Sequence, residues 1–268
     1  MGQPVLASLT QLLRYTPLIR SLVARELQAR YRGSVLGFLW SFVNPLLQLL
    51  IFTFIFTEVV PVRGGSQEGP YALFLYCGLL PWTWFNSSLI EATSVLIAGG
   101  NLIRKVLFPA EILPIVSVIA GLVHFGFGLA ILAVFLLAYQ VPIAPTDLLW
   151  FPVIVFAQLA FTLGLALLLS ALTVHFRDVR DLLANLLLIL FWATPVVYSL
   201  DQVPERVRPL LAINPLAHLI RAYREILAVP GPFEQGPRVL AIAAASVLVF
   251  CAGYFVFDRL RDTLAEEV

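Results

Sequence analysis

The segment LQARYRGSVLGFLWSFVNPLLQLLIFTFIF, residues Leu27–Phe56, places a basic stretch directly before a long apolar one. Its first part carries Arg30 and Arg32, and no charged residue follows from Gly33 to Phe56. A helix needs about 20 apolar residues to cross the hydrocarbon core of a membrane, and this run is long enough. The segment therefore predicts a membrane-spanning helix that begins next to a basic surface helix.

The composition of the whole chain extends this prediction. The 268 residues are 60% hydrophobic and only 12% charged, with a mean hydropathy of +0.92, whereas soluble domains are about half apolar and a quarter charged. The apolar runs leave too little polar sequence for a soluble domain of ordinary size. We expect one all-α integral membrane domain.

Several function classes find no support in the sequence. The net charge is +1 and the basic residues lie at the ends of apolar runs, so no nucleic-acid surface is predicted. Cys77 and Cys251 lie far apart, without the spacing of a metal or redox motif, and the histidines are scattered singly. The sequence predicts no catalytic residue and no metal site.

Six apolar runs have the length of a membrane span and are bounded by charged or turn residues. They extend from about Leu36 to Val59, Tyr71 to Ile97, Ile112 to Ala138, Leu149 to Thr173, Leu182 to Tyr198, and Val239 to Phe257. The fifth run is the shortest and ends at TPVVY, where Pro195 interrupts helical hydrogen bonding.

The placement of Lys and Arg predicts the orientation of these spans. With the N-terminus in the cytoplasm, the cytoplasmic segments carry eleven of the 17 Lys and Arg residues. Five of the remaining six lie in the long segment between Ser199 and Arg238, and long segments translocate largely regardless of charge. We expect both termini in the cytoplasm of a multi-pass protein.

The stretch Pro17–Arg32 predicts an amphipathic helix along the cytoplasmic membrane face. Glu26 and Arg30 interrupt its apolar stripe in the favourable i, i+4 order, which suits contact with a polar partner, although a plain interfacial anchor is the alternative. The stripe comprises Leu18, Ile19, Leu22 and Val23, and the opposite side carries Arg20, Arg25, Gln28 and Arg32.

Two further segments between spans carry helical signals. The stretch Gly99–Pro114 mixes apolar residues with Arg104 and Lys105, so it can bury one face in a groove of a partner. In the outer segment Leu200–Pro237, Asn214 is a candidate N-cap followed by Pro215 at the first helical position. We expect two short helices that enter the outer leaflet of the membrane there.

Six motifs, in this order, resemble those of one family over nearly the whole chain: the membrane-spanning permease subunits of ABC-2 type exporters, which move lipid-linked polysaccharides such as O-antigen, teichoic acid or capsule. The motifs are RELQARYRGSVLGFLWSFVNPLLQLLIFTFIF (Arg25–Phe56), GLLPWTWFNSSL (Gly78–Leu89), NLIRKVLFPAEILP (Asn101–Pro114), HFRDVRDLL (His175–Leu183), FWATPVVYSL (Phe191–Leu200) and NPLAHLIRAYREIL (Asn214–Leu227). The resemblance implies six transmembrane helices, a second copy of the chain around a central pathway, and two separate ATPase subunits, in a bacterial cytoplasmic (inner) membrane.

The resemblance also divides the chain. It implies a cytoplasmic segment 1–35 with an interface helix, a transmembrane domain 36–257 with a cytoplasmic coupling helix at about 101–109 and external re-entrant helices at about 200–230, and a cytoplasmic tail 258–268. The interface helix would present Arg25, Glu26, Arg30 and Arg32. The coupling helix would contact the ATPase through Leu102, Ile103, Arg104, Lys105, Leu107, Phe108 and Pro109.

An ATP-driven exporter must bind nucleotide, yet the sequence holds no GxxxxGK[ST] loop. Its one lysine, Lys105, follows Arg104 instead of glycine. We therefore expect no cofactor in this chain, with ATP and magnesium bound by the partner ATPase.

Aromatic side chains are candidates for the wall of a glycan pathway, because the apolar faces of sugar rings stack on aromatic rings. The candidates are Trp40, Phe42, Phe52, Phe56, Phe191, Trp192 and Tyr198. The alternative for each is an ordinary lipid-facing or interfacial aromatic residue.

Other functions remain open at this stage. An ABC-2 permease for a drug or a small lipid would share the fold. A membrane enzyme would need charged groups clustered at one face, and a secondary transporter would show an internal repeat; the sequence shows neither feature.

Overall fold

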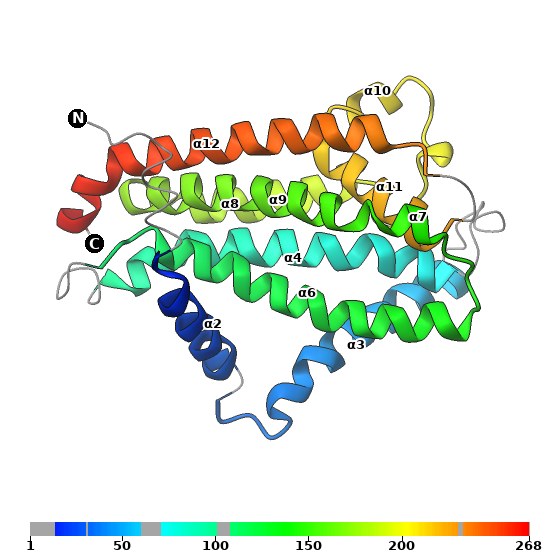
Figure 1. The fold of residues 1–268 in the computed structure, drawn as a ribbon, viewed down its shortest axis with the longest axis horizontal. Helices are drawn as coiled ribbons and strands as arrows, with labels where there is room; N and C mark the ends of the chain where they lie inside the picture. The colour runs from blue at the N-terminus through cyan, green and yellow to red at the C-terminus, as the bar shows by residue number, and fades with distance from the viewer. Residues whose placement is uncertain (1–13, 31, 60–70, 101–107, 230–232, 268) are drawn as a thin grey trace.

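The computed structural model describes residues 14–30, 32–59, 71–100, 108–229 and 233–267, which form helices and turns without a strand. Its helices α4 (Tyr71–Ala98), α6 (Ile112–Ala138), α8 (Phe151–His175), α9 (Val179–Ala193) and α12 (Gly236–Glu267) lie side by side along the long axis of the molecule (Figure 1). Helices α4, α8 and α12 run in one direction and α6 and α9 in the other, as successive passes through one layer would.

Helices α2 (Thr16–Arg30) and α3 (Trp40–Phe54) stand at an angle to this bundle (Figure 1). The short helix η1 (Gly37–Leu39) precedes α3, and one π-helical turn, η2 (Ile55–Val59), continues it. The C-terminal end of α12 lies at the same end of the molecule as α2, and the other end holds the short elements α7 (Pro145–Leu148), η3 (Leu200–Gln202), α10 (Arg208–Leu211) and α11 (Pro215–Leu227).

The observed helices follow the six predicted spans closely. Helix α6 has the predicted bounds, and α4 and α8 differ from theirs by at most two residues. Helix α9 begins earlier than expected and ends at Ala193, two residues before Pro195, as the loss of helical hydrogen bonding at proline requires. Helix α12 extends to Glu267, so it continues through most of the predicted cytoplasmic tail.

Among the described residues, four helical segments are long and apolar enough to cross a membrane: Trp40–Val59, Ile112–Ala138, Pro145–His175 and Gly236–Arg261. Two predicted spans are not among them. Helix α9 has 15 residues, and α4 has 28 residues but carries a polar stretch that includes Asn86, Ser87 and Glu91.

Helix α4 is the interior helix of the bundle, which accounts for its lower hydropathy. Its side chains are buried along most of its length, against α6, α8, α3, α9 and α11. Polar contacts in its middle include the buried Gln158 side chain, which donates to the Pro81 carbonyl at 2.8 Å, and the Trp84 indole, which donates to the Val118 carbonyl at 3.2 Å. A helix surrounded by protein contacts little lipid, so it can carry polar groups.

Helices α8 and α12 approach each other closely at two glycines. A β-carbon on Gly164 would lie 2.6 Å from the Val249 carbonyl oxygen, and one on Gly253 would overlap the Gly164 carbonyl group. Small residues at a helix crossing let two membrane helices pack backbone against backbone. Glycine is therefore required on both sides of this crossing.

Candidate functional site

Helix α2 uses its predicted apolar stripe for packing inside the protein. Val23 is buried, and Leu18, Ile19 and Leu22 pack with it against Ile112, Val116 and Ala120 at the start of α6. The predicted interface residues Arg25, Glu26, Arg30 and Arg32 are all exposed on or just after the helix. Helix α2 thus presents its charged side outward while its apolar side holds it on α6.

An ion pair ties the end of α2 to α4. The Arg30 guanidinium both hydrogen-bonds and pairs with the Glu91 carboxylate, and the two side chains are 31% and 30% exposed. The sequence favoured Glu26 as the neighbour of Arg30, but the partner comes from 61 positions further along the chain. Glu91 lies in the second predicted span, and its carboxylate is paired.

The predicted coupling residues fall largely outside the described part of the chain. Leu102, Ile103, Arg104, Lys105 and Leu107 all lie in the segment 101–107. Phe108 and Pro109 are described: Pro109 is buried, and Phe108 is half-buried between two apolar clusters that also share Ile19. Phe108 therefore packs against α2 and the adjoining ends of the bundle.

A second ion pair joins the beginning of α6 to α12. Arg261 Nη1 lies 3.6 Å from Oε1 of Glu111, whose side chain is buried. Glu111 lies two residues after Pro109 along the chain. The end of the predicted coupling segment is thus connected to α2 by apolar contact and to α12 by charge.

The structure brings five of the seven candidate pathway aromatics together. The Phe52 ring lies 6.2 Å from those of Phe56 and Phe191, the Phe191 ring lies 5.3 Å from that of Trp192, and the Tyr198 hydroxyl donates to the Trp192 carbonyl at 2.7 Å. Trp192 is 54% exposed. This aromatic cluster links α3 to α9 and has an open side.

The other two candidates lie near the start of α3, apart from that cluster. Phe42 packs against Phe127 of α6, with ring centroids 5.5 Å apart. The Trp40 indole donates to the Ser34 hydroxyl at 2.9 Å, and Trp40 lines a separate polar cavity. Trp40 and Phe42 are therefore separated from the other five candidates within the single chain.

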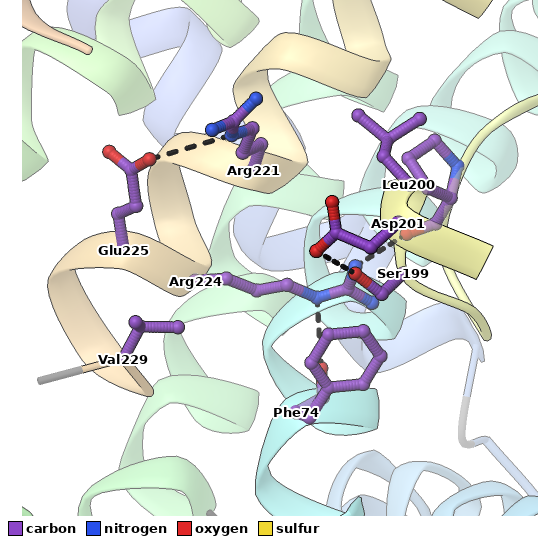
Figure 2. Close-up of a pocket in the computed structure, with 9 residues that line it drawn as sticks. Phe74, Ser199, Leu200, Asp201, Arg221, Arg224, Glu225 and Val229 are labelled. Atoms are coloured by element: carbon purple, nitrogen blue, oxygen red, sulfur yellow. Dashed lines mark hydrogen bonds and ion pairs between the residues drawn. The ribbon is translucent and has the colours of Figure 1, made fainter. Parts of the chain in front are cut away.

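A buried arginine organises the opposite end of the bundle (Figure 2). Arg224 of α11 donates to the carbonyls of Phe74 at 3.1 Å and Pro195 at 2.6 Å, and also to the Val196 carbonyl. Its guanidinium carbon lies 3.6 Å from the centroid of the Phe74 ring. Arg224 thus binds two carbonyls just beyond the end of α9, those of Pro195 and Val196, and one near the start of α4, that of Phe74.

The predicted N-cap completes this arrangement. The Asn214 side chain accepts from the Leu216 backbone N–H at 3.0 Å and donates to the Thr194 hydroxyl at 2.7 Å. It therefore caps α11 and fixes α11 to the end of α9. The sequence predicted the cap, but not the second bond.

A small cavity of about 180 Å³ lies beside Arg224, between α11, α4 and the segment after α9 (Figure 2). On its rim, Arg221 Nε lies 3.5 Å from Glu225 Oε1, and the Ser199 hydroxyl donates to Asp201 at 3.4 Å. Both carboxylates thus have a local partner, although Oε2 of Glu225 is buried without a hydrogen bond among the described residues. The cavity is a gap beside a structural anchor.

A larger cavity, of about 230 Å³, lies among α2, α3, α4 and α6. Sequence reasoning missed it, although a signal was present: Asn44 and Gln48 lie four residues apart in α3, as do Thr83 and Ser87 in α4, and this spacing places each pair on one helix face. The polar part of its lining comprises Arg30, Ser41, Asn44, Gln48, Thr83, Asn86, Ser87 and His124.

Comparison with known proteins identifies the family. Residues 17–228 match the model of the ABC-2 type transporter family. Two O-antigen export system permease proteins named RfbA are similar over almost their whole length: that of Myxococcus xanthus is 40% identical over 261 residues (96% of this chain, 98% of the relative), and one of Klebsiella pneumoniae is 34% identical over 248 residues (90% and 91%). The polysialic acid transport protein KpsM of Escherichia coli is 21% identical over 255 residues (92% and 94%). The chain described here therefore belongs to the ABC-2 type transporter family of membrane permeases.

Proposed function

We propose that this chain is the membrane permease of an ABC exporter that moves a lipid-linked polysaccharide across a bacterial cytoplasmic membrane. The observation that carries the proposal is the 40% identity to an O-antigen export permease over 96% of the chain. An alignment over 96% of the chain includes the helices of the bundle and the segments that connect them. A drug or small-lipid permease of the same family is the alternative.

The proposed topology has six membrane passes with both termini in the cytoplasm. Helices α4 and α9 supply the second and fifth passes, with α4 shielded from lipid by its neighbours and α9 continued by the segment that Arg224 binds. The alternating directions of the bundle helices support this topology (Figure 1). In this orientation α2 lies at the cytoplasmic face as the interface helix, and α10 and α11 enter the outer leaflet as re-entrant helices.

Energy would come from two separate ATPase subunits, which would bind the ATP and magnesium. The proposed contacts are the exposed charges of α2 and the segment 101–109. Phe108 and Glu111 support this role, because they connect that segment to α2 and α12. A displacement of this segment by the ATPase would then be transmitted to both α2 and α12.

A second copy of the chain would complete the pathway. The exposed apolar residues of α3 and α9, such as Leu50, Phe54 and Trp192, would face either that copy or lipid. The aromatic cluster of Phe52, Phe56, Phe191, Trp192 and Tyr198 would border the path and let sugar rings slide past. Trp40 and Phe42 would border its cytoplasmic entrance.

Deleting the gene in its host tests this function. We expect the surface polysaccharide to disappear and the lipid-linked glycan to accumulate inside the cell, with both restored by the gene on a plasmid. The control is a strain with an inactive Walker motif in the partner ATPase, which should show the same accumulation. Unchanged surface glycan in the deletion strain, together with a new sensitivity to drugs, would favour the alternative.

A further inference from the structure

In the proposed topology, the polar cavity among α2, α3, α4 and α6 extends into the hydrocarbon layer of the membrane. His124, one of its lining residues, lies 12 residues after the start of α6, which is about 18 Å along the helix. The hydrocarbon core is about 30 Å thick, so the cavity extends to about its middle. Polar side chains at that depth are costly and normally serve a function.

Three amide side chains in the lining have unused hydrogen-bonding capacity. Within the part of the chain that the structure describes, Asn44, Gln48 and Asn86 form no side-chain hydrogen bond. Gln48 and Asn86 are half-buried and Asn44 is exposed, so their amide groups are accessible from the cavity. Each amide can both donate to and accept from a polar molecule there.

The hydroxyl groups in the lining are oriented as acceptors. The Thr83 hydroxyl donates to the Leu79 carbonyl at 2.9 Å, and the Ser87 hydroxyl donates to the Thr83 carbonyl at 2.8 Å. Both oxygens therefore keep lone pairs for a donor. Together with the amides, which donate and accept, they suit a ligand that has many hydroxyl groups.

The charge of the lining argues against an anion. Arg30 is the one arginine or lysine of the lining, and its charge is compensated by Glu91. Glu91 lies four residues after Ser87 on α4, so the pair closes the end of the cavity next to α2. The indole of Trp40 adds a flat apolar surface. Neutral amides, hydroxyl acceptors and an aromatic face are the groups that bind a neutral sugar.

We propose that this cavity binds one neutral sugar residue of the exported glycan on the cytoplasmic side of the pathway. This inference rests on the proposed function and deepens it. It assigns a binding site between α3, α4 and α6, separate from the aromatic cluster of α3 and α9. Asn44, Gln48 and Asn86 bind the sugar hydroxyls, and Trp40 covers one face of the ring. The Arg30–Glu91 pair lies between the bound sugar and the rest of the interface helix α2.

Protection of an introduced cysteine tests binding directly. The Ser87→Cys variant, in complex with its ATPase in lipid nanodiscs, is labelled with N-ethylmaleimide in the presence of D-glucose, D-galactose, D-mannose or N-acetyl-D-glucosamine. At least one neutral sugar should slow labelling saturably, by about half at a concentration equal to its Kd, as one-site binding requires. Inorganic phosphate should give no protection. Labelling of Gln202→Cys, at the other end of the molecule, should not change with sugar.

Two results would overturn the inference. Protection by phosphate and not by sugars would make the cavity an anion site, such as one for a lipid phosphate. No protection by either class of probe, while Ser87→Cys is still labelled and exports glycan, would mean that the cavity binds neither.

Export in cells separates this inference from the proposed function. Gln48→Leu and Asn86→Leu should reduce surface glycan while the permease still inserts and binds its ATPase, and the matched variant Gln202→Leu should export normally. If gene deletion abolishes export but both cavity variants export at the unmutated level, the sugar site is wrong and the function stands. If deletion leaves export intact, the function itself is wrong.

Discussion

The guanidinium of Arg30 and the carboxylate of Glu91 form an ion pair between α2 and α4, two helices whose sequences are separated by a complete membrane span. The pair is about one-third exposed, so water screens part of the attraction. It joins the helix proposed to meet the ATPase to the interior helix of the bundle. Motion of α2 would therefore act on α4 directly.

A double-mutant cycle on Arg30→Gln and Glu91→Gln should detect this pair. We expect a coupling free energy of about 1 kcal/mol, the upper part of the range for partly exposed pairs. The measurement is unfolding of the detergent-solubilised permease at low salt, and the coupling should fall at high salt. Glu26→Gln, on the exposed side of α2, is the control; a coupling as large between Arg30 and Glu26 would contradict the assignment.

Arg224→Met should destabilise the permease strongly. The change removes the donor of the Pro195 and Val196 carbonyls, which lie beyond the end of α9, and an unsatisfied buried group costs about 1 to 3 kcal/mol. Arg224→Lys should restore little of the stability, because the single ammonium group of lysine cannot donate to several carbonyls in the planar geometry of a guanidinium. Thermal unfolding in detergent measures both, against Arg221→Met on the exposed side of α11. Equal stability of the Arg224 and Arg221 variants would show that the carbonyls find other donors.

Gly253→Ala should disrupt the crossing of α8 and α12. The added methyl group overlaps the Gly164 carbonyl, and overpacking costs about 1 to 3 kcal/mol. Gly126→Ala is the matched control, because a β-carbon there meets no atom within 4 Å and alanine favours helix by about 1 kcal/mol. Opposite shifts in melting temperature are the expected result, and a harmless Gly253→Ala would refute the close approach.

Leu107→Ala and Phe108→Ala should differ in where they act. Leu107→Ala should weaken association with the ATPase by about 1 to 3 kcal/mol, the range of an interface anchor. Phe108→Ala should in addition lower the stability of the permease alone, since Phe108 packs against α2 and the bundle. Arg104→Ala should mainly alter the salt dependence of association. Co-purification measures association with the ATPase, and thermal unfolding measures the stability of the permease. If association is unchanged for all three variants, α2 becomes the candidate contact with the ATPase.

Cysteine labelling of intact cells should confirm the proposed topology. Arg206→Cys, in the exposed turn before α10, should react with a membrane-impermeant maleimide added outside. Arg177→Cys, in the exposed turn between α8 and α9, should react only after the cells are opened. The reverse pattern would invert the orientation, and the parent protein controls for Cys77 and Cys251.

Local signals in the sequence predicted the helices well, because each depends on neighbouring residues. Apolar length defined α6, Pro195 marked the end of α9, and Asn214 with Pro215 marked the start of α11. The apolar stripe of α2 was also confirmed, although it packs on α6 and not along a free surface.

The site depended on contacts between distant parts of the chain, and here the sequence was a weaker guide. The outer segment offered no sign that Arg224 would be buried among carbonyls, since its neighbour Arg221 is exposed. Asn44 and Asn86 lie on different helices, and the spacing of polar residues within one helix does not show that the two lie close together. They become a site only when α3 and α4 pack so that both line one cavity.

The glycine crossing also determines which parts of the permease can move during transport. A β-carbon on Gly253 would already overlap the Gly164 carbonyl, so the two backbones leave no free space between them, and the two helices behave as one rigid unit. Helix α3 is held differently, since only Ser41 and Leu49 of its 15 residues are buried and its other contacts are side-chain contacts such as Phe52 with Phe191. Tilting α3 away from this rigid unit would open both the aromatic cluster and the polar cavity in one movement.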